Sequence, residues 1–299
     1  MLLQVRDKEE AAMAYQILTD SSADLTAREI TDAGVQIVPL VLHFRGQELR
    51  NPGEAELRAF YAALRAGEPA TTSAANPEDW AAVMEPVLQA GEDVLVLAFS
   101  SGLSTTCQSA RIAAGDLQET YPDRKILVSD TLCASRGQGL LVWYAARKRQ
   151  EGMDIDTLYA WAEETKLRLC HWFTVDDLMF LKRGGRISAT TAVVGSMLNI
   201  KPVLHVDDEG HLINLGKVRG RKASLDALVR KAEELGDPES LADTVFLCHG
   251  DCVEDAEYVA ARMKEKFGTR TVSIGYTGAV IGAHSGPGTL ALFFLGKHR

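Results

Sequence analysis

The sequence predicts an α/β fold divided into two α/β domains. Short runs of β-branched and apolar residues alternate with longer segments of helical periodicity, the pattern of βα units and a largely parallel sheet. The chain has 299 residues, more than one small hydrophobic core usually organises. Because the composition shifts at residues 151–154, we expect a disordered leader over 1–14, an N-terminal α/β domain over 15–152 and a C-terminal α/β domain over 153–299.

The N-terminal half shows clear helix and strand signals. Thr26 and Glu29 are spaced as a capping box, and Gly34 follows where that helix should stop. Pro77 suits the first position of a later helix, and the run 94–99 is apolar enough for a strand covered on both faces. We expect strands at 15–19, 35–38, 40–44, 94–99 and 126–129. We expect a helix at 54–65, a polar loop at 71–76, a helix start near 106 and a helix ending at 149.

The C-terminal half continues the same alternation with more polar connections. The predicted elements are a helix at 156–169, strands at 203–206, 244–248 and 271–274, and a helix at 253–267. A turn is expected at 207–210, a polar stretch at 216–222 and a Gly-rich turn at 282–288. The α/β character therefore extends through the whole chain.

Charge and cysteine content exclude several classes of protein. Lys plus Arg is 32 and Asp plus Glu is 41, which gives a net charge of −9. An acidic surface without a strongly basic cluster disfavours nucleic acid as a partner. The five cysteines form no CxxC pair, which favours a reducing compartment. The first 15 residues lack the apolar core of a signal peptide, so we expect a cytoplasmic protein with no stable membrane insertion.

Three segments place hydroxyl or imidazole groups beside an expected strand end or helix start. Ser100 and Ser101 follow an apolar strand and precede a helix, where hydroxyls and free backbone N–H groups accept anions. Thr72 and Ser73 lie in the polar loop, and His284 lies in the Gly-rich turn. Each also has a purely structural interpretation, as a helix cap or a packed histidine. What the three share is a set of donors suited to a carboxylate.

Two further patterns have weaker chemical meaning. Cys248, His249, Asp251 and Cys252 offer metal-ligand atoms, but their spacing matches no standard zinc site, so no metal is expected. The segments 184–186 and 217–222 are basic, and the second is either a solvated face or a docking patch for an acidic partner. Neither fits a phosphate-binding loop, and no Walker A or GxGxxG pattern occurs in the chain.

Seven segments, in order along the chain, resemble the DegV family, the fatty-acid-binding subunits of bacterial fatty acid kinase. They are TDSSADL at 19–25, TS at 72–73, SSGLS at 100–104, KRGGRIS at 182–188, KPVL at 201–204, GKVRGRK at 216–222 and GAHSGPG at 282–288. Together they span the chain from residue 15 to its C-terminal end. No single segment is diagnostic, but the ordered set is specific.

The resemblance implies two α/β domains with a long-chain fatty acid in a tunnel between them and no cofactor. The fatty acid carboxylate is then expected at Thr72, Ser101 and His284, with Ser73 and Ser100 close by. Two positions depart from the family pattern: Ala74-Ala75 replaces the usual Gln-Pro, and Thr105 replaces a usual Gly. The first departure removes an amide side chain beside the head-group loop.

The resemblance also implies a partner. Arg186 is expected near the head group or the kinase interface, and Arg219 and Arg221 are expected to face the catalytic kinase subunit. That subunit would supply ATP and convert the acid to acyl phosphate for phospholipid synthesis. The chain itself would then be a lipid-binding carrier and not an enzyme.

Two other functions remain open at the level of sequence. A serine hydrolase would use Ser101 or Ser104 as nucleophile, His284 as base and an orienting residue such as Asp130, although the GxSxG pattern is missing. A kinase or phosphocarrier would use His284 as phosphate acceptor, supported by the basic stretch 217–222.

Overall fold

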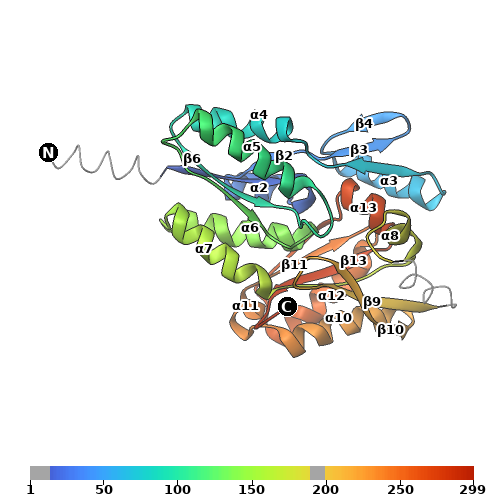
Figure 1. Ribbon diagram of the computed structural model, residues 1–299. Helices are drawn as coiled ribbons and strands as arrows, with labels where there is room; N and C mark the ends of the chain where they lie inside the picture. The colour runs from blue at the N-terminus through green and yellow to red at the C-terminus, as the bar shows by residue number, and fades with distance from the viewer. Residues whose placement is uncertain (1–13, 189–198) are drawn as a thin grey trace.

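The computed structural model describes residues 14–188 and 199–299. It contains two large β-sheets, one above the other in Figure 1, and a small third sheet beside them. The leader predicted for residues 1–14 falls, except for Ala14, outside the described residues. The α/β fold is confirmed.

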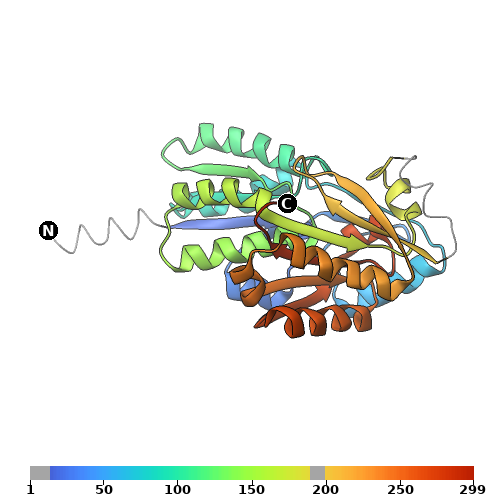
Figure 2. The same cartoon turned by 90° about the horizontal axis from the view of Figure 1, so that it is seen from below.

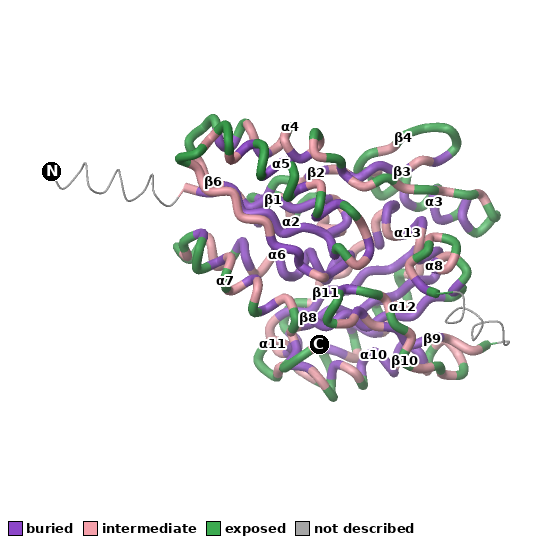
Figure 3. Tube along the Cα trace, in the orientation of Figure 1, coloured by how far each residue is buried: buried purple, intermediate pink, exposed green. Residues whose placement is uncertain are grey.

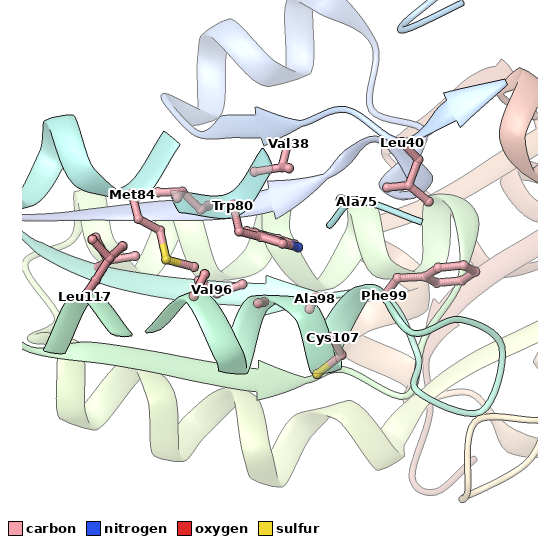
Figure 4. Packing of buried hydrophobic residues seen from close by; sticks show 14 of the residues in the cluster. Val38, Leu40, Ala75, Trp80, Met84, Val96, Ala98, Phe99, Cys107 and Leu117 are labelled. Atoms are coloured by element: carbon pink, nitrogen blue, oxygen red, sulfur yellow. The ribbon is translucent and has the colours of Figure 1, made fainter. Parts of the chain in front are cut away.

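The first sheet is parallel, in the order β2-β1-β6-β7. Side chains of its central strand β6 alternate between two cores: Val94, Val96 and Ala98 belong to one, and Leu95 and Leu97 to the other. Figure 4 shows the first core, to which α4 contributes Trp80 and Met84 and α5 contributes Cys107 and Leu117. The strands are β1 (Tyr15–Asp20), β2 (Gln36–Val38), β6 (Asp93–Ala98) and β7 (Ile126–Asp130). The helices are α2 (Ala27–Ala33), α4 (Pro77–Gln89), α5 (Thr106–Thr120), α6 (Ser135–Gln150) and α7 (Ile155–Thr165), with the short 3₁₀ helix η1 (Ser21–Ala23) after β1.

The second sheet has six strands in the order β10-β9-β8-β13-β11-β12 and is mixed. Only β11 and β12 pair in parallel, so the predicted parallel arrangement is wrong for this half. Its strands are β8 (Leu169–Thr174), β9 (Ile200–Val206), β10 (Leu212–Arg219), β11 (Thr244–His249), β12 (Thr271–Tyr276) and β13 (Leu290–Leu295). Helices α10 (Arg221–Leu235), α11 (Pro238–Asp243) and α12 (Val253–Phe267) cover one face, as the view from below shows (Figure 2). The 3₁₀ helix η2 (Lys166–Arg168) precedes β8.

The third sheet, β4-β3-β5, replaces part of the polar loop expected at 71–76. Its strands are β3 (Val41–Phe44), β4 (Gln47–Leu49) and β5 (Ala70–Ser73). It packs with α3 (Glu54–Arg65) and with α13 (Ala279–Ser285), which forms where a Gly-rich turn was expected. The short helix α8 (Met179–Arg183) lies beside α13.

Helix α6 joins the two large sheets. It contacts β6 on one side and β8, β11 and β13 on the other, and its first half is buried throughout (Figure 3). Helix α7 packs against α6 and the first sheet, although it lies beyond the boundary predicted after residue 152. That domain boundary stays a prediction.

None of the helices within 14–188 and 199–299 combines the length and apolarity that crossing a bilayer requires.

Candidate functional site

A cavity of about 430 Å³ lies between the two large sheets. Most of its wall is apolar, with Leu40, Phe99, Leu103, Phe173 and Phe293 among the lining side chains. Polar groups line it as well, from β5, the loop after β6, the segment after α8, and α13. This is the form of a site for a largely apolar ligand oriented by a few polar groups.

His284 and Thr72 form a hydrogen bond in the wall of the cavity. The Nε2 atom of His284 lies 2.7 Å from the hydroxyl of Thr72, which projects from β5. Burial, together with the charge of Arg186, lowers the pKa of His284 to about 4, so the imidazole is neutral near pH 7. On its other side the ring lies against Gly184, where a Cβ atom would come 2.2 Å from Nδ1. Gly184 is therefore required for this position of His284.

Arg186 supplies positive charge to the same cavity. Its guanidinium donates to the carbonyl oxygens of Gly184 and, over 3.2 Å, Leu103, so it links the segment after α8 to the loop after β6. Burial lowers the pKa of this guanidinium. Within residues 14–188 and 199–299 no carboxylate lies within ion-pair distance of it. A partly buried arginine without a carboxylate partner suits an anionic ligand.

The loop after β6 places its two serines differently. Ser101 is exposed and lines the cavity, while its backbone N–H donates over 3.2 Å to Asp130. Ser100 is fully buried, donates over 2.9 Å to the carbonyl of Gly210 and accepts from the N–H of Gly102. Its hydroxyl is therefore engaged in holding the loop and does not line the cavity, contrary to its predicted ligand role.

Of the remaining predicted residues, one lines the cavity and two lie outside it. Ser73 lines the cavity, but its hydroxyl is paired with His43 Nε2 at 2.7 Å. Arg219 is exposed on the edge strand β10. Arg221 is bound 2.8 Å from Asp255 and lies 3.7 Å from Asp176, so carboxylates of this chain already occupy its guanidinium. Thr72, Ser73, Ser101, Arg186 and His284 thus share one cavity, and Ser100, Arg219 and Arg221 lie outside it.

Ser285 is a site residue that the sequence analysis did not select. It is 5% exposed, lines the cavity beside His284, and its hydroxyl has no hydrogen-bond partner among the described residues. The residue stands in the segment GAHSGPG, but that segment was interpreted as a turn. In a helix, positions 284 and 285 both reach the face that also presents Val280 and Ile281 to the cavity.

The geometry does not support a serine hydrolase. Asp130 accepts from the backbone N–H groups of Ser101 and Leu132, and His284 pairs with Thr72. In the described part of the chain no hydrogen bond joins His284 to Ser101, Ser104 or a carboxylate. The Ser–His–Asp relay that such an enzyme needs is therefore not assembled.

The predicted lack of a metal centre at residues 248–252 stays a prediction. Strand β11 ends at His249, one residue beyond the expected end at Cys248, and residues 250–252 connect it to α12. The groups of potential metal ligands within 14–188 and 199–299 comprise a single cluster, Asp207, Glu209 and His211, in the turn between β9 and β10. Two of the three are exposed, and none of the three lines the cavity.

Comparison with known proteins agrees with this architecture. Residues 14–297 match the family described as "Uncharacterised protein, DegV family". A DegV domain-containing protein of Clostridium perfringens is 45% identical over 285 residues, covering 94% of this chain and 97% of that protein. The fatty-acid-binding DegV family protein of Thermus thermophilus superposes with a TM-score of 0.85 at 30% identity, covering 95% of this chain and all (100%) of the other. DegV of Bacillus subtilis, described as a fatty acid binding protein, gives 0.81 at 28% identity, covering 95% and 100%. The chain belongs to the DegV family.

Proposed function

We propose that this protein binds a long-chain fatty acid in the cavity, with the carboxylate at Thr72, Ser101, Arg186 and His284. The observation that supports this most is the Arg186 guanidinium, which has no carboxylate partner among the described residues and lies beside hydroxyl and imidazole groups in a mostly apolar cavity. Burying a carboxylate requires such partners, because an unpaired buried charge is strongly unfavourable. The fatty acid binding described for the relatives from T. thermophilus and B. subtilis supports the same ligand.

The acyl chain provides most of the affinity in this proposal. Transfer of each methylene from water contributes about 0.8 kcal/mol, so roughly fourteen methylenes contribute about 11 kcal/mol before ordering costs. The polar groups orient the ligand, because they bind its carboxylate and leave the acyl chain to the apolar wall. No cofactor is needed for this role.

We further propose that the protein presents its ligand to a fatty acid kinase. Ser101 is exposed at the cavity, which favours access to the carboxylate from outside. A carboxylate oxygen would attack the γ-phosphorus of ATP held by the catalytic subunit, forming acyl phosphate and releasing ADP. The exposed Arg219 is the better docking candidate, since Arg221 is engaged by Asp255. In this proposal the protein is a non-catalytic carrier in the cytoplasm that feeds phospholipid synthesis.

The kinase role is tested by reconstitution. Protein loaded with octadecanoic acid is mixed with a bacterial fatty acid kinase catalytic subunit and γ-labelled ATP, and acyl phosphate is trapped as the hydroxamate. Product is expected only when carrier, kinase and fatty acid are all present. Product formed by the isolated carrier would instead support the hypothesis that this protein is itself a kinase or phosphocarrier. Fatty acid binding without product in the full mixture would separate the carrier role from the kinase role.

Ser101→Ala is expected to weaken retention of the fatty acid about two- to tenfold, the value of one hydrogen bond. Acyl phosphate formation should fall with it. Ligand occupancy of the purified variant by native mass spectrometry measures the first effect. Ser109→Ala, on α5 and away from the cavity, is the matched control. Unchanged occupancy in Ser101→Ala would remove Ser101 from the site.

Acidification should destabilise the empty protein through His284. Its folded pKa of about 4 is below the ordinary 6.5, so the unfolded chain binds the proton first and stability falls as pH drops from 6.5 to 4. A bound carboxylate raises this pKa, so the fatty acid complex should lose less stability over the same range. Melting temperatures of empty and loaded protein measure both effects. Other buried histidines contribute equally to the wild type and His284→Asn, so an identical pH profile in the two proteins would contradict the assignment.

A further inference from the structure

A serine–histidine pair lies at the rim of the cavity, on the small sheet β4-β3-β5. The hydroxyl of Ser73, the last residue of β5, lies 2.7 Å from Nε2 of His43 on β3. Ser73 is exposed and also lines the cavity, so it stands where the cavity meets solvent. Because side chains alternate along a strand, Ser73 projects from the face of β5 opposite to that of Thr72. The pair is therefore separate from the contact between Thr72 and His284.

Glu48 completes a row of three side chains on this face of the sheet. It stands directly opposite His43 in the register of β4 and β3, and Ser73 lies diagonally across from His43 on β5. Oε1 of Glu48 lies 3.7 Å from Nδ1 of His43. This separation is longer than a hydrogen bond, as is common for catalytic contacts before a substrate binds. A carboxylate on this side favours a proton on Nδ1, which leaves Nε2 to accept the proton of Ser73.

A donor for a developing oxyanion follows Ser73 in the chain. Among the described residues, the backbone N–H of Ala74 donates no hydrogen bond, and Ala74 lines the cavity. In α/β-hydrolases, the N–H group of the residue after the nucleophile stabilises the oxyanion. A nucleophile, a base and an oxyanion donor thus lie together at the rim of an apolar cavity, which is the set of groups that acyl transfer requires.

We propose that Ser73, His43 and Glu48 hydrolyse a long-chain acyl thioester whose acyl chain lies in the cavity and whose thiol portion stays outside. The inference rests on the proposed fatty acid function and goes beyond it, since the acid that the carrier holds would be the product of this reaction. His43 and Glu48 are 36% and 69% exposed, which leaves room for a bulky thiol on the open side of the sheet. In the later kinase reaction the chain remains non-catalytic.

The reaction has two acyl-transfer steps. Ser73 Oγ attacks the carbonyl carbon and passes its proton to His43 Nε2, and the carbon–sulfur bond breaks as the thiol leaves with that proton. The acyl group is then held as an ester of Ser73. Water attacks the ester and gives a proton to His43, the bond from carbon to Oγ breaks, and Ser73 recovers the proton. Glu48 is a positioning residue that orients the imidazole. The fatty acid is released beside Thr72 and His284.

The test is hydrolysis of octadecanoyl-coenzyme A by delipidated full-length protein, with the released acid measured by mass spectrometry. Wild type is expected to exceed Ser73→Ala and His43→Gln by about 100-fold or more, the usual contribution of a general base. Glu48→Gln should lower kcat about tenfold and leave KM unchanged, since it acts through His43. A fluorophosphonate probe should label Ser73 in the wild type and fail to label His43→Gln.

The control variant is Thr71→Val, which removes a hydroxyl from the same face of β5 and should retain wild-type hydrolysis. Octadecanoic acid that still binds while neither hydrolysis nor labelling occurs would overturn the inference and leave the carrier function intact. Hydrolysis that persists in Ser73→Ala would also overturn it. Hydrolysis that depends on Ser73 in a protein that retains no fatty acid would support the inference and reject the carrier function.

Discussion

Arg136→Met is expected to lower the free energy of unfolding by about 3–5 kcal/mol, the cost of breaking a buried ion pair from one side. Arg136 is fully buried near the start of α6 and binds both carboxylate oxygens of Glu29 on α2, at 2.9 and 2.6 Å. It also donates over 2.6 Å to Ser273 on β12 and lies 4.5 Å over the ring of Phe246. The side chain thereby ties the first sheet's helices to the second sheet.

The carboxylate left behind explains the size of this effect. Burial alone would raise the pKa of Glu29, but Arg136 holds it at about 2. Without Arg136, Glu29 remains partly buried and must take up a proton or draw in water. Chemical denaturation with urea measures the loss. Arg28→Met is the matched control, because its pair with Asp32 on the same helix is exposed (89% and 65%) and should contribute about 0.5 kcal/mol or less. An equal effect of both substitutions would contradict the account.

Arg186→Met is expected to raise the Kd for a long-chain fatty acid about 10- to 150-fold. Hydrogen bonds to charged groups contribute about 1.5–3 kcal/mol, and Met keeps much of the apolar side chain. The loss should be specific for the ionised head group. Binding of the methyl ester of the same acid should therefore change little between wild type and variant.

Arg183→Met is the control for this substitution. Arg183 lies on the adjacent α8, is exposed and stacks 4.6 Å over Phe180 without lining the cavity. Competition with a fluorescent fatty acid, run in parallel for acid and ester, gives the dissociation constants of both ligands for the wild type and the two variants. An equal loss for acid and ester would show that Arg186 shapes the cavity and does not bind the carboxylate.

Sequence patterns predicted the first sheet well because its inner strands, β1 and β6, are buried along nearly their whole length. A continuous apolar run such as 94–99 has few alternatives, and the capping box of Thr26 and Glu29 was found as expected. The second sheet was harder to predict from sequence patterns. Strand β8, Leu169–Thr174, follows a helix without a Gly or Pro break, so the helix was extended to 169 although α7 ends at Thr165. Strand β5 consists of Ala70, Thr71, Thr72 and Ser73, whose polarity is typical of a loop.

The candidate site was predictable as a set of residue types but not as an arrangement. His284 was expected in a turn, whereas the glycines at 278 and 286 instead bound the short helix α13. That change of conformation brings Ser285 to the cavity, which no local pattern indicated. Ser100 and Ser101 are neighbours of the same type, and only the carbonyl of Gly210, 110 residues away, decides that Ser100 is structural. Contacts of this kind depend on tertiary structure.

The central claim is that the cavity holds one fatty acid, and it is tested most directly by native mass spectrometry of freshly purified protein. Solvent extraction then identifies whatever is released. We expect one fatty acid for each protein chain, with Thr72, Arg186 and His284 variants carrying less. Protein that is empty as isolated, and remains empty when offered fatty acids of varied length and unsaturation, would contradict the claim.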